Sequence, residues 1–395
     1  MEKDFYKYQS QTTPHPLAIQ VSRAEGSFIY DTKSNEYLDF IAGVSACSLG
    51  HGHPKVIAAV KKQLDKYLHV MVYGEFILEP AVALTKLLSN FLPENLTTTY
   101  LTNSGTEAIE GSIKLARRAT GRKEIVYAKN AYHGNTMGAL SIMGLEERKE
   151  KFKPLIPECN SITFNNEEDI LKITTKTAGV VLETIQGGAG FILPENDYLK
   201  KIKKRCAEVG ALLILDEIQP GFGRTGKLFG FEHYDVSPDI LAIGKGMGGG
   251  MPIGAFTASE ELMSLLSNNP KLGHITTFGG NPVIASAALA TLKELTESNL
   301  IKETLQKEKI FREQLIHPLI KEIRGKGLML AIMVETSEIA SEVILNCKNK
   351  GLLLFWLLFE TKAIRITPPL TISDEEIMKG CQIIIQVLNS INTSN

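Results

Sequence analysis

The sequence predicts an α/β fold: a large domain with a mostly parallel central sheet, joined to a smaller α+β domain. In the middle of the chain, apolar β-branched runs alternate with helical patterns. Polar residues do not interrupt these runs, which is typical of parallel strands buried on both faces. After about residue 282, two long helical patterns precede short strands. A chain of 395 residues is long enough for two or three structural units.

The elements follow from hydrophobic periodicity and from turn and capping residues. Strands are expected at residues 27–30, 37–41, 97–102, 124–128, 178–185, 211–215, 240–243, 253–257, 327–334 and 363–367. Helices are expected at residues 54–68, 107–118, 197–209, 283–296, 300–315 and 374–388. We therefore expect an N-terminal segment at 1–50 that packs with the small domain, a large domain at 51–281 and a small C-terminal domain at 282–395.

Composition excludes several classes of function. The 43 Lys and Arg residues balance 44 Asp and Glu residues, so no basic excess favours binding to nucleic acid or to anionic membranes. The five cysteines are scattered without a CxxC spacing, which argues against a disulfide framework or a structural zinc. Scattered thiols, and an N-terminus without an apolar run, lead us to expect a cytoplasmic protein. The longest apolar run, 352–359, is too short to span a bilayer and predicts a buried strand or strand pair.

The first chemically dense stretch is Ser104-Gly105-Thr106, between an expected strand and an expected helix. Gly105 allows close backbone approach, and the first helical amides suit a phosphate. The alternative is a plain capped turn. The stretch is neither a Walker A loop nor a GxGxxG motif.

Two further stretches follow strands. Asp216 ends a fully apolar strand, where a carboxylate needs a cation or a donor. A protonated pyridine nitrogen, a Mg²⁺ ion and a structural ion pair are all possible partners. Lys245 ends another apolar strand among glycines. Partial desolvation there would favour its neutral amine, which can form a Schiff base with an aldehyde cofactor; the alternative is a solvated loop lysine.

Three weaker features complete the set. Tyr132 follows a strand and can stack on a ring, whereas His133 beside it fits a packed or hydrogen-bonded structural histidine. The loop at 276–282 is rich in hydroxyl groups and glycine. His51 and His53 have no third ligand type nearby, so no metal site is expected.

The combination favours one cofactor. A phosphate cradle, a stacking aromatic, a carboxylate for a ring nitrogen and a Schiff-base lysine together describe a site for pyridoxal 5′-phosphate.

The ordered motifs SGTEA, YHG, ETIQG, DEIQ, GFGRTG, GKG and TTFGGNP closely resemble those of the class III aminotransferases of the pyridoxal-phosphate-dependent transferase fold type I. The similarity covers nearly the whole chain and is strongest to the branch that handles ornithine and acetylornithine. The resemblance implies a transaminase that moves an amino group from an ω-amino donor to 2-oxoglutarate. The alternative is another class III reaction: an aminomutase, a racemase or a decarboxylating transaminase.

Carried over to this chain, the resemblance makes Lys245 the Schiff-base residue and proton shuttle, and Asp216 the partner of the pyridinium. Gln219 would bind the ring hydroxyl, while Ile218 and Tyr132 would cover the two ring faces. The cofactor-binding positions implied are Ser104, Gly105, Thr106, Tyr132, His133, Glu183, Asp216, Ile218, Gln219, Lys245 and Thr277.

The resemblance also implies how substrate and partner are bound. Arg365 would grip the α-carboxylate of small amino acid and oxo acid substrates. Thr277 would reach the phosphate of the partner subunit, so that a homodimer shares its active sites. Glu183 would support Gln219. Gly188 stands where the family usually has a glutamate that masks the arginine, and Asn135 stands where acetylornithine enzymes usually have arginine. We therefore expect Arg365 to stay unmasked and the donor to be selected differently.

Overall fold

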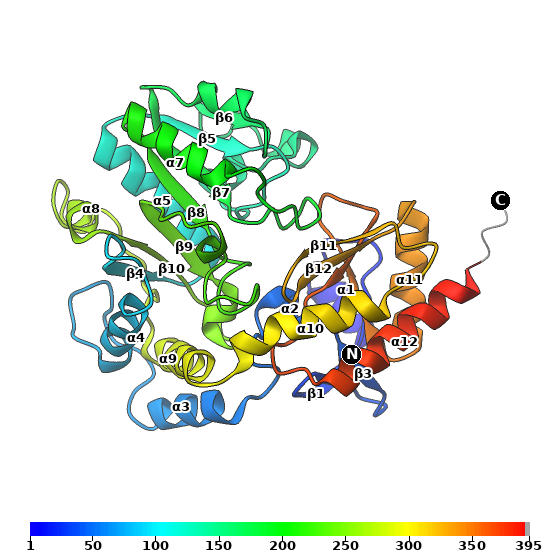
Figure 1. Cartoon of the computed structure of the whole chain (residues 1–395). Helices are drawn as coiled ribbons and strands as arrows, with labels where there is room; N and C mark the ends of the chain where they lie inside the picture. The colour runs from blue at the N-terminus through cyan, green and yellow to red at the C-terminus, as the bar shows by residue number, and fades with distance from the viewer. Residues whose placement is uncertain (392–395) are drawn as a thin grey trace.

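A computed structural model describes residues 1–391 (Figure 1). Its largest sheet has seven strands in the order β4-β10-β9-β8-β7-β5-β6. These strands are β4 (Thr98–Thr102), β5 (Glu124–Ala128), β6 (Cys159–Ile162), β7 (Thr177–Glu183), β8 (Leu212–Asp216), β9 (Ile240–Gly244) and β10 (Gly254–Ala258). β10 is antiparallel to both β4 and β9, whereas the other strands share one direction. The prediction of a mostly parallel sheet is confirmed.

Helices cover both faces of this sheet. The helices of this region are α3 (Pro54–Leu64), α4 (Glu79–Ser89), α5 (Gly105–Thr120), α6 (Met137–Ser141), α7 (Tyr198–Val209), α8 (Glu260–Ser264) and α9 (Pro282–Glu297). Of these, α4, α5, α7 and α8 contact the strands, whereas α6 packs on α5, α9 on α4 and α3 on α9. Successive residues of β7 point to opposite faces. Val180 and Leu182 belong to the same core cluster as Ile202 of α7, whereas Val181 belongs to that of Ile109 of α5. Both faces are therefore buried, which explains why these strands are uninterrupted apolar runs.

Two four-stranded sheets form the rest of the molecule. One has the order β1-β2-β3-β13 and the other β11-β12-β15-β14. Their strands are β1 (Val21–Glu25), β2 (Phe28–Asp31), β3 (Glu36–Asp39), β11 (Glu322–Lys326), β12 (Met329–Met333), β13 (Leu352–Leu353), β14 (Phe355–Trp356) and β15 (Ala363–Ile366). The helices are α1 (Glu2–Tyr8), α2 (Ala42–Ser45), α10 (Leu300–Gln314), α11 (Ser337–Asn349) and α12 (Asp374–Ser390).

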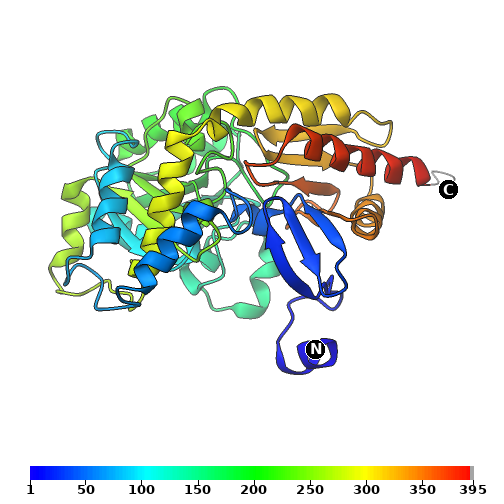
Figure 2. The same ribbon diagram turned by 90° about the horizontal axis from the view of Figure 1, so that it is seen from below.

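The N-terminal strands pack with the C-terminal region. β13 pairs in parallel with β3, and Figure 2 shows the N-terminal strands beside the C-terminal helices. α9 packs on α3 and α4, whereas α10 packs on α12. α9 begins at the expected boundary between residues 281 and 282, yet it packs on helices that precede this boundary. The division into 1–50, 51–281 and 282–395 stays a prediction, and residues 392–395 lie outside the described range.

The apolar run at 352–359 forms two short strands, β13 and β14, that belong to different sheets. Phe355 is exposed at the start of the second. Within residues 1–391, no helix combines the length and the apolar character that a bilayer crossing requires.

A Gly380→Ala substitution is expected to destabilise the protein by about 1–3 kcal/mol, as overpacking of a filled core does. A Cβ at Gly380 would lie 2.1 Å from Cζ of the buried Phe40, where α12 meets the N-terminal segment. Helix propensity alone predicts the opposite sign, because alanine favours a helix over glycine. Thermal unfolding measures the effect, and Gln382→Ala, exposed on the same helix, is the control. An unchanged or higher Tm for G380A would contradict the packing.

Candidate active site

The chemically dense stretches meet at one edge of the large sheet. Ser104 lies just past β4 and Tyr132 just past β5, Glu183 ends β7, Asp216 ends β8, and Lys245 directly follows β9. Because these strands run in the same direction, their carboxyl ends share one edge, where ligands of open α/β sheets sit. The sequence predicted this edge.

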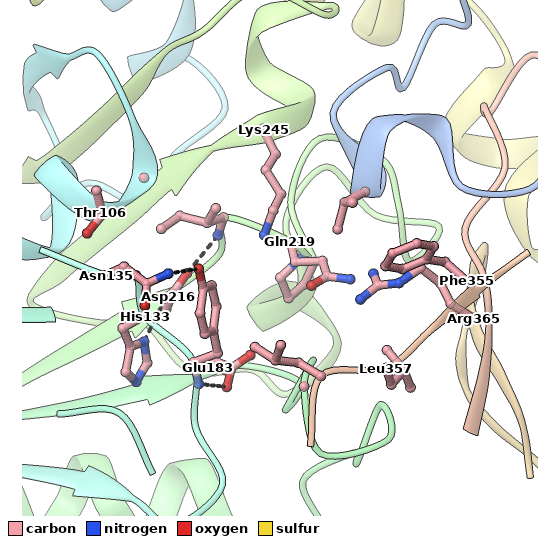
Figure 3. A pocket seen from close by; sticks show the side chains of 18 of the residues that line it. Thr106, His133, Asn135, Glu183, Asp216, Gln219, Lys245, Phe355, Leu357 and Arg365 are labelled. Carbon is pink, nitrogen blue, oxygen red and sulfur yellow. Dashed lines mark hydrogen bonds and ion pairs between the residues drawn. The ribbon is translucent and has the colours of Figure 1, made fainter. Parts of the chain in front are cut away.

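A cavity of about 670 Å³ opens there, within the range of small-molecule sites (Figure 3). It contains ten of the residues that the sequence singled out: Gly105, Thr106, Tyr132, His133, Glu183, Asp216, Ile218, Gln219, Lys245 and Arg365. Asn135 and Gly188 also line it. The side chain of Lys245 reaches into the cavity between Asp216 and Arg365 (Figure 3).

Lys245 is partly buried. Desolvation lowers the pKa of its amine, while the nearby Asp216 carboxylate opposes that shift. Its backbone φ is 43°, in the left-handed region that residues with a Cβ rarely adopt. Such strain costs about 1–3 kcal/mol and is concentrated at functional sites. The side chain points into the cavity and not away from the protein, which argues against a solvated loop lysine (Figure 3).

Asp216 is held by two hydrogen bonds. Its Oδ1 accepts the backbone N–H of Ile218 at 3.0 Å, and its Oδ2 lies 2.7 Å from Nδ1 of His133. His133 is thus a buried, hydrogen-bonded histidine, with its Nε2 unpaired among the described residues. The buried Nε2 of Gln219 likewise has no partner among residues 1–391.

Glu183 holds two backbone segments beside the cavity, at Tyr132 and at Gly187. Its Oε1 accepts the backbone N–H of Tyr132 at 3.0 Å, and its Oε2 accepts that of Gly187 at 2.8 Å. Burial raises the pKa of Glu183 to about 7. The Tyr132 hydroxyl accepts a hydrogen bond from Nδ2 of Asn135 at 3.0 Å. Burial raises the pKa of this hydroxyl.

The N-terminus of α5 forms the hydroxyl-rich end of the cavity. Ser104 caps the helix, since its Oγ accepts the N–H of Glu107 at 3.4 Å, and it does not line the cavity. A Cβ at Gly105 would lie 2.8 Å from Cδ1 of Ile218, so the close approach needs glycine. Thr106 Oγ1 lies 2.7 Å from Oγ1 of Thr136, a residue that no sequence motif pointed to.

Arg365, in β15, comes from outside the large sheet. Burial lowers the pKa of its guanidinium to about 10. Its Nε and Nη1 are buried and have no partner within residues 1–391, and no described carboxylate forms an ion pair with it. A Cβ at Gly188 would lie 2.8 Å from Cδ2 of Phe359, so a side chain at position 188 fits only if Phe359 moves.

Two predicted features lie away from the cavity. Thr277 is exposed and does not line the cavity of its own chain. His51 binds Asp39, with Nε2 2.8 Å from Oδ2, and His53 lies 4.0 Å from Glu294. No group of three His, Cys, Asp or Glu side chains in residues 1–391 is arranged to hold a metal.

Most of the outer wall was not predicted from the sequence. Its members are Val44, Gly134, Arg148, Pro220, Phe355, Trp356, Leu357 and Leu358. The run at 352–359 was a signal for buried strands, but nothing in it indicated that its second half faces the cavity.

The donors present fit a planar, phosphate-bearing pyridine. Buried polar atoms of Gln219, His133 and Arg365 lack partners among the described residues, Asp216 supplies a carboxylate, and Lys245 supplies an amine. The first amides of a 16-residue helix, at Gly105 and Thr106, have no intrahelical acceptors and suit a phosphate.

Comparisons with known proteins agree with this fit. The family model described as aminotransferase class-III matches residues 8–388. The chain is 39% identical to an acetylornithine aminotransferase of Caldanaerobacter subterraneus subsp. tengcongensis, over 94% of this chain and 95% of that protein. It is 40% identical to a putrescine aminotransferase of Pectobacterium atrosepticum, over 98% and 86% of the two chains.

A solved structure shares the fold. The ornithine aminotransferase of Toxoplasma gondii ME49 superposes with a TM-score of 0.90 at 30% identity, covering 99% of this chain and 95% of that one. The chain therefore belongs to the class III aminotransferases, enzymes of fold type I that use pyridoxal 5′-phosphate.

Proposed function

We propose that this aminotransferase moves an amino group from an ω-amino donor of the ornithine or acetylornithine type to 2-oxoglutarate, with Lys245 carrying the cofactor. The observation that carries the proposal is the partly buried Lys245 amine between Asp216 and Arg365, whose guanidinium is unpaired within residues 1–391. Relatives that act on acetylornithine, ornithine and putrescine by name support an ω-amino donor.

When bound, pyridoxal phosphate supplies the electron sink for bonds broken at the amino-bearing carbon. Asp216 would hold the ring nitrogen, Gln219 the ring hydroxyl, and Tyr132 and Ile218 the two ring faces. At the other end, the phosphate would be bound by Gly105 and Thr106 at the start of α5, the helix that Ser104 caps. Glu183 and His133 would act through Tyr132 and Asp216, which they contact.

Lys245 would hold the cofactor and move a proton at the substrate carbon. Because burial lowers the pKa of its amine, the neutral form that can accept a proton becomes more accessible near neutral pH.

Arg365 would bind the α-carboxylate. A guanidinium can donate two parallel hydrogen bonds to a carboxylate, and two of its nitrogens have no other acceptor among the described residues. Gly188 offers no side chain to mask it, and Phe359 occupies the adjacent space.

Thr277 would complete the site of a second copy in a homodimer. Its hydroxyl is exposed and far enough from its own cavity not to line it, which supports a role between subunits.

Glutamate formation from 2-oxoglutarate tests the proposal. We expect the purified holoenzyme to form glutamate with at least one of N-acetylornithine, ornithine, putrescine and 4-aminobutyrate. Each donor is assayed at equal concentration, with the donor omitted as the control. No glutamate with any donor would contradict the transaminase proposal. Efficient and selective turnover of N-acetylornithine would contradict a role for Asn135 and Gly188 in donor selection.

A further inference from the structure

Three of the residues that line the cavity have basic side chains: Lys245, Arg365 and Arg148. Arg365 is buried and Lys245 is partly buried. The two lie near each other, since the positive charge of Arg365 helps to lower the pKa of the lysine. Arg148 is exposed while lining the same cavity, so it stands at the mouth. The three charges thus run from the interior to the entrance.

Arg148 is held in place at the end of a short 3-10 helix, Glu146–Arg148. Its Nη2 donates to the Leu358 carbonyl at 3.2 Å, and its Cζ lies 5.5 Å from the centroid of the Phe359 ring, within cation–π distance. In the described chain its Nε and Nη1 donate no hydrogen bond, and no carboxylate lies within ion-pair distance. The Leu358 carbonyl therefore holds Nη2 of the guanidinium in place, while Nε and Nη1 remain free to donate hydrogen bonds to a ligand.

The neighbouring groups leave this charge uncompensated. Glu146 is bound by Lys149 and Lys153 instead. Asn135, which lines the same wall, is neutral and donates its Nδ2 to Tyr132. The fixed positive charge at the mouth therefore comes from Arg148.

We propose that Arg148 is a specificity residue that binds a carboxylate at the end of the substrate furthest from Lys245. With Arg365 binding the inner carboxylate, Arg148 would favour amino acceptors that carry a second carboxylate, such as 2-oxoglutarate, whereas the ω-amino donors would not use this contact. A guanidinium with free N–H groups matches carboxylate geometry. This inference rests on the proposed transaminase function and names the substrate class of the same site.

The test compares diacids with monoacids of the same carbon count. Calorimetry measures how tightly the holoenzyme binds glutarate and pentanoate, and steady-state assays compare 2-oxoglutarate with 2-oxopentanoate through their KM values. In Arg148→Gln the preference for the diacid, by Kd and by KM, is expected to fall about tenfold, the size of a lost charge-assisted hydrogen-bond pair. Arg148→Lys is expected to restore some of the preference.

Lys151→Gln is the matched control, because it removes one positive charge from the same segment at an exposed residue that does not line the cavity. It is expected to leave the preference unchanged. An equal shift for diacid and monoacid in R148Q, or no shift in either, would overturn the proposal. Glutarate binding that depends on Arg148 in an enzyme that forms no glutamate would support this site and refute the transaminase function.

Discussion

A Lys245→Ala variant is expected to lose turnover by more than about 10³-fold, as enzymes do when a residue that acts within a catalytic unit is removed. In the proposed mechanism, the Lys245 amine, which lines the cavity, holds the cofactor covalently and moves a proton at the substrate carbon. The variant keeps a Cβ, so the backbone at φ 43° is strained to a similar degree and the fold is expected to persist. Initial rates of glutamate formation and the absorbance spectrum of the purified protein measure the change.

Lys307→Ala is the control for loss of a buried lysine. Lys307 lies in α10, outside the cavity, and its Nζ donates to the Leu370 carbonyl at 2.6 Å. This variant is expected to lose stability but to keep the spectrum of the bound cofactor and turnover. Normal transamination by Lys245→Ala would refute the assignment of the site.

An Asp216→Asn variant is expected to lower kcat by about 10²–10³-fold, the usual effect of removing one preorganised electrostatic contact. The amide has the shape of the carboxylate and can still accept the N–H of Ile218, but it carries no charge to stabilise a protonated ring nitrogen. The measurements are kcat and the pH titration of the absorbance of the bound cofactor. We expect the titration to shift, because the charge beside the ring changes.

Asp239→Asn is the matched control. Like Asp216, Asp239 accepts a backbone hydrogen bond, because its Oδ2 accepts the N–H of Leu213. Its Oδ1 forms an ion pair with Lys203. It precedes β9 and thus lies at the opposite edge from the cavity. An equal loss of kcat in both variants would show that a structural defect, and not the charge of Asp216, causes the effect.

Much of the fold could be predicted because buried parallel strands carry a strong local signal. β7, β8 and β9 are uninterrupted apolar runs, and each is found within a few residues of its predicted place. Edge strands carry a weaker signal, since solvent covers some of their surface. β6, at the edge of the large sheet, and β11, with the sequence EIRGK, were therefore not predicted.

The antiparallel direction of β10 was not predictable either. Its sequence is as apolar as that of its neighbours, because it is also buried on both faces. Strand direction depends on how the chain returns to the sheet, which is a property of the connections and not of the strand residues.

The sequence by itself determined the chemistry of the inner site. Asp216, Lys245 and the start of α5 each follow a parallel strand, and parallel strands bring their carboxyl ends together. Only the tertiary structure showed which residues form the entrance of the cavity. Arg148 and the wall at 355–358 come from segments about 200 residues apart, and their contact depends on how β14 packs beside β15. Local sequence patterns report burial and turn geometry, but they do not report which distant surfaces the folded chain brings together.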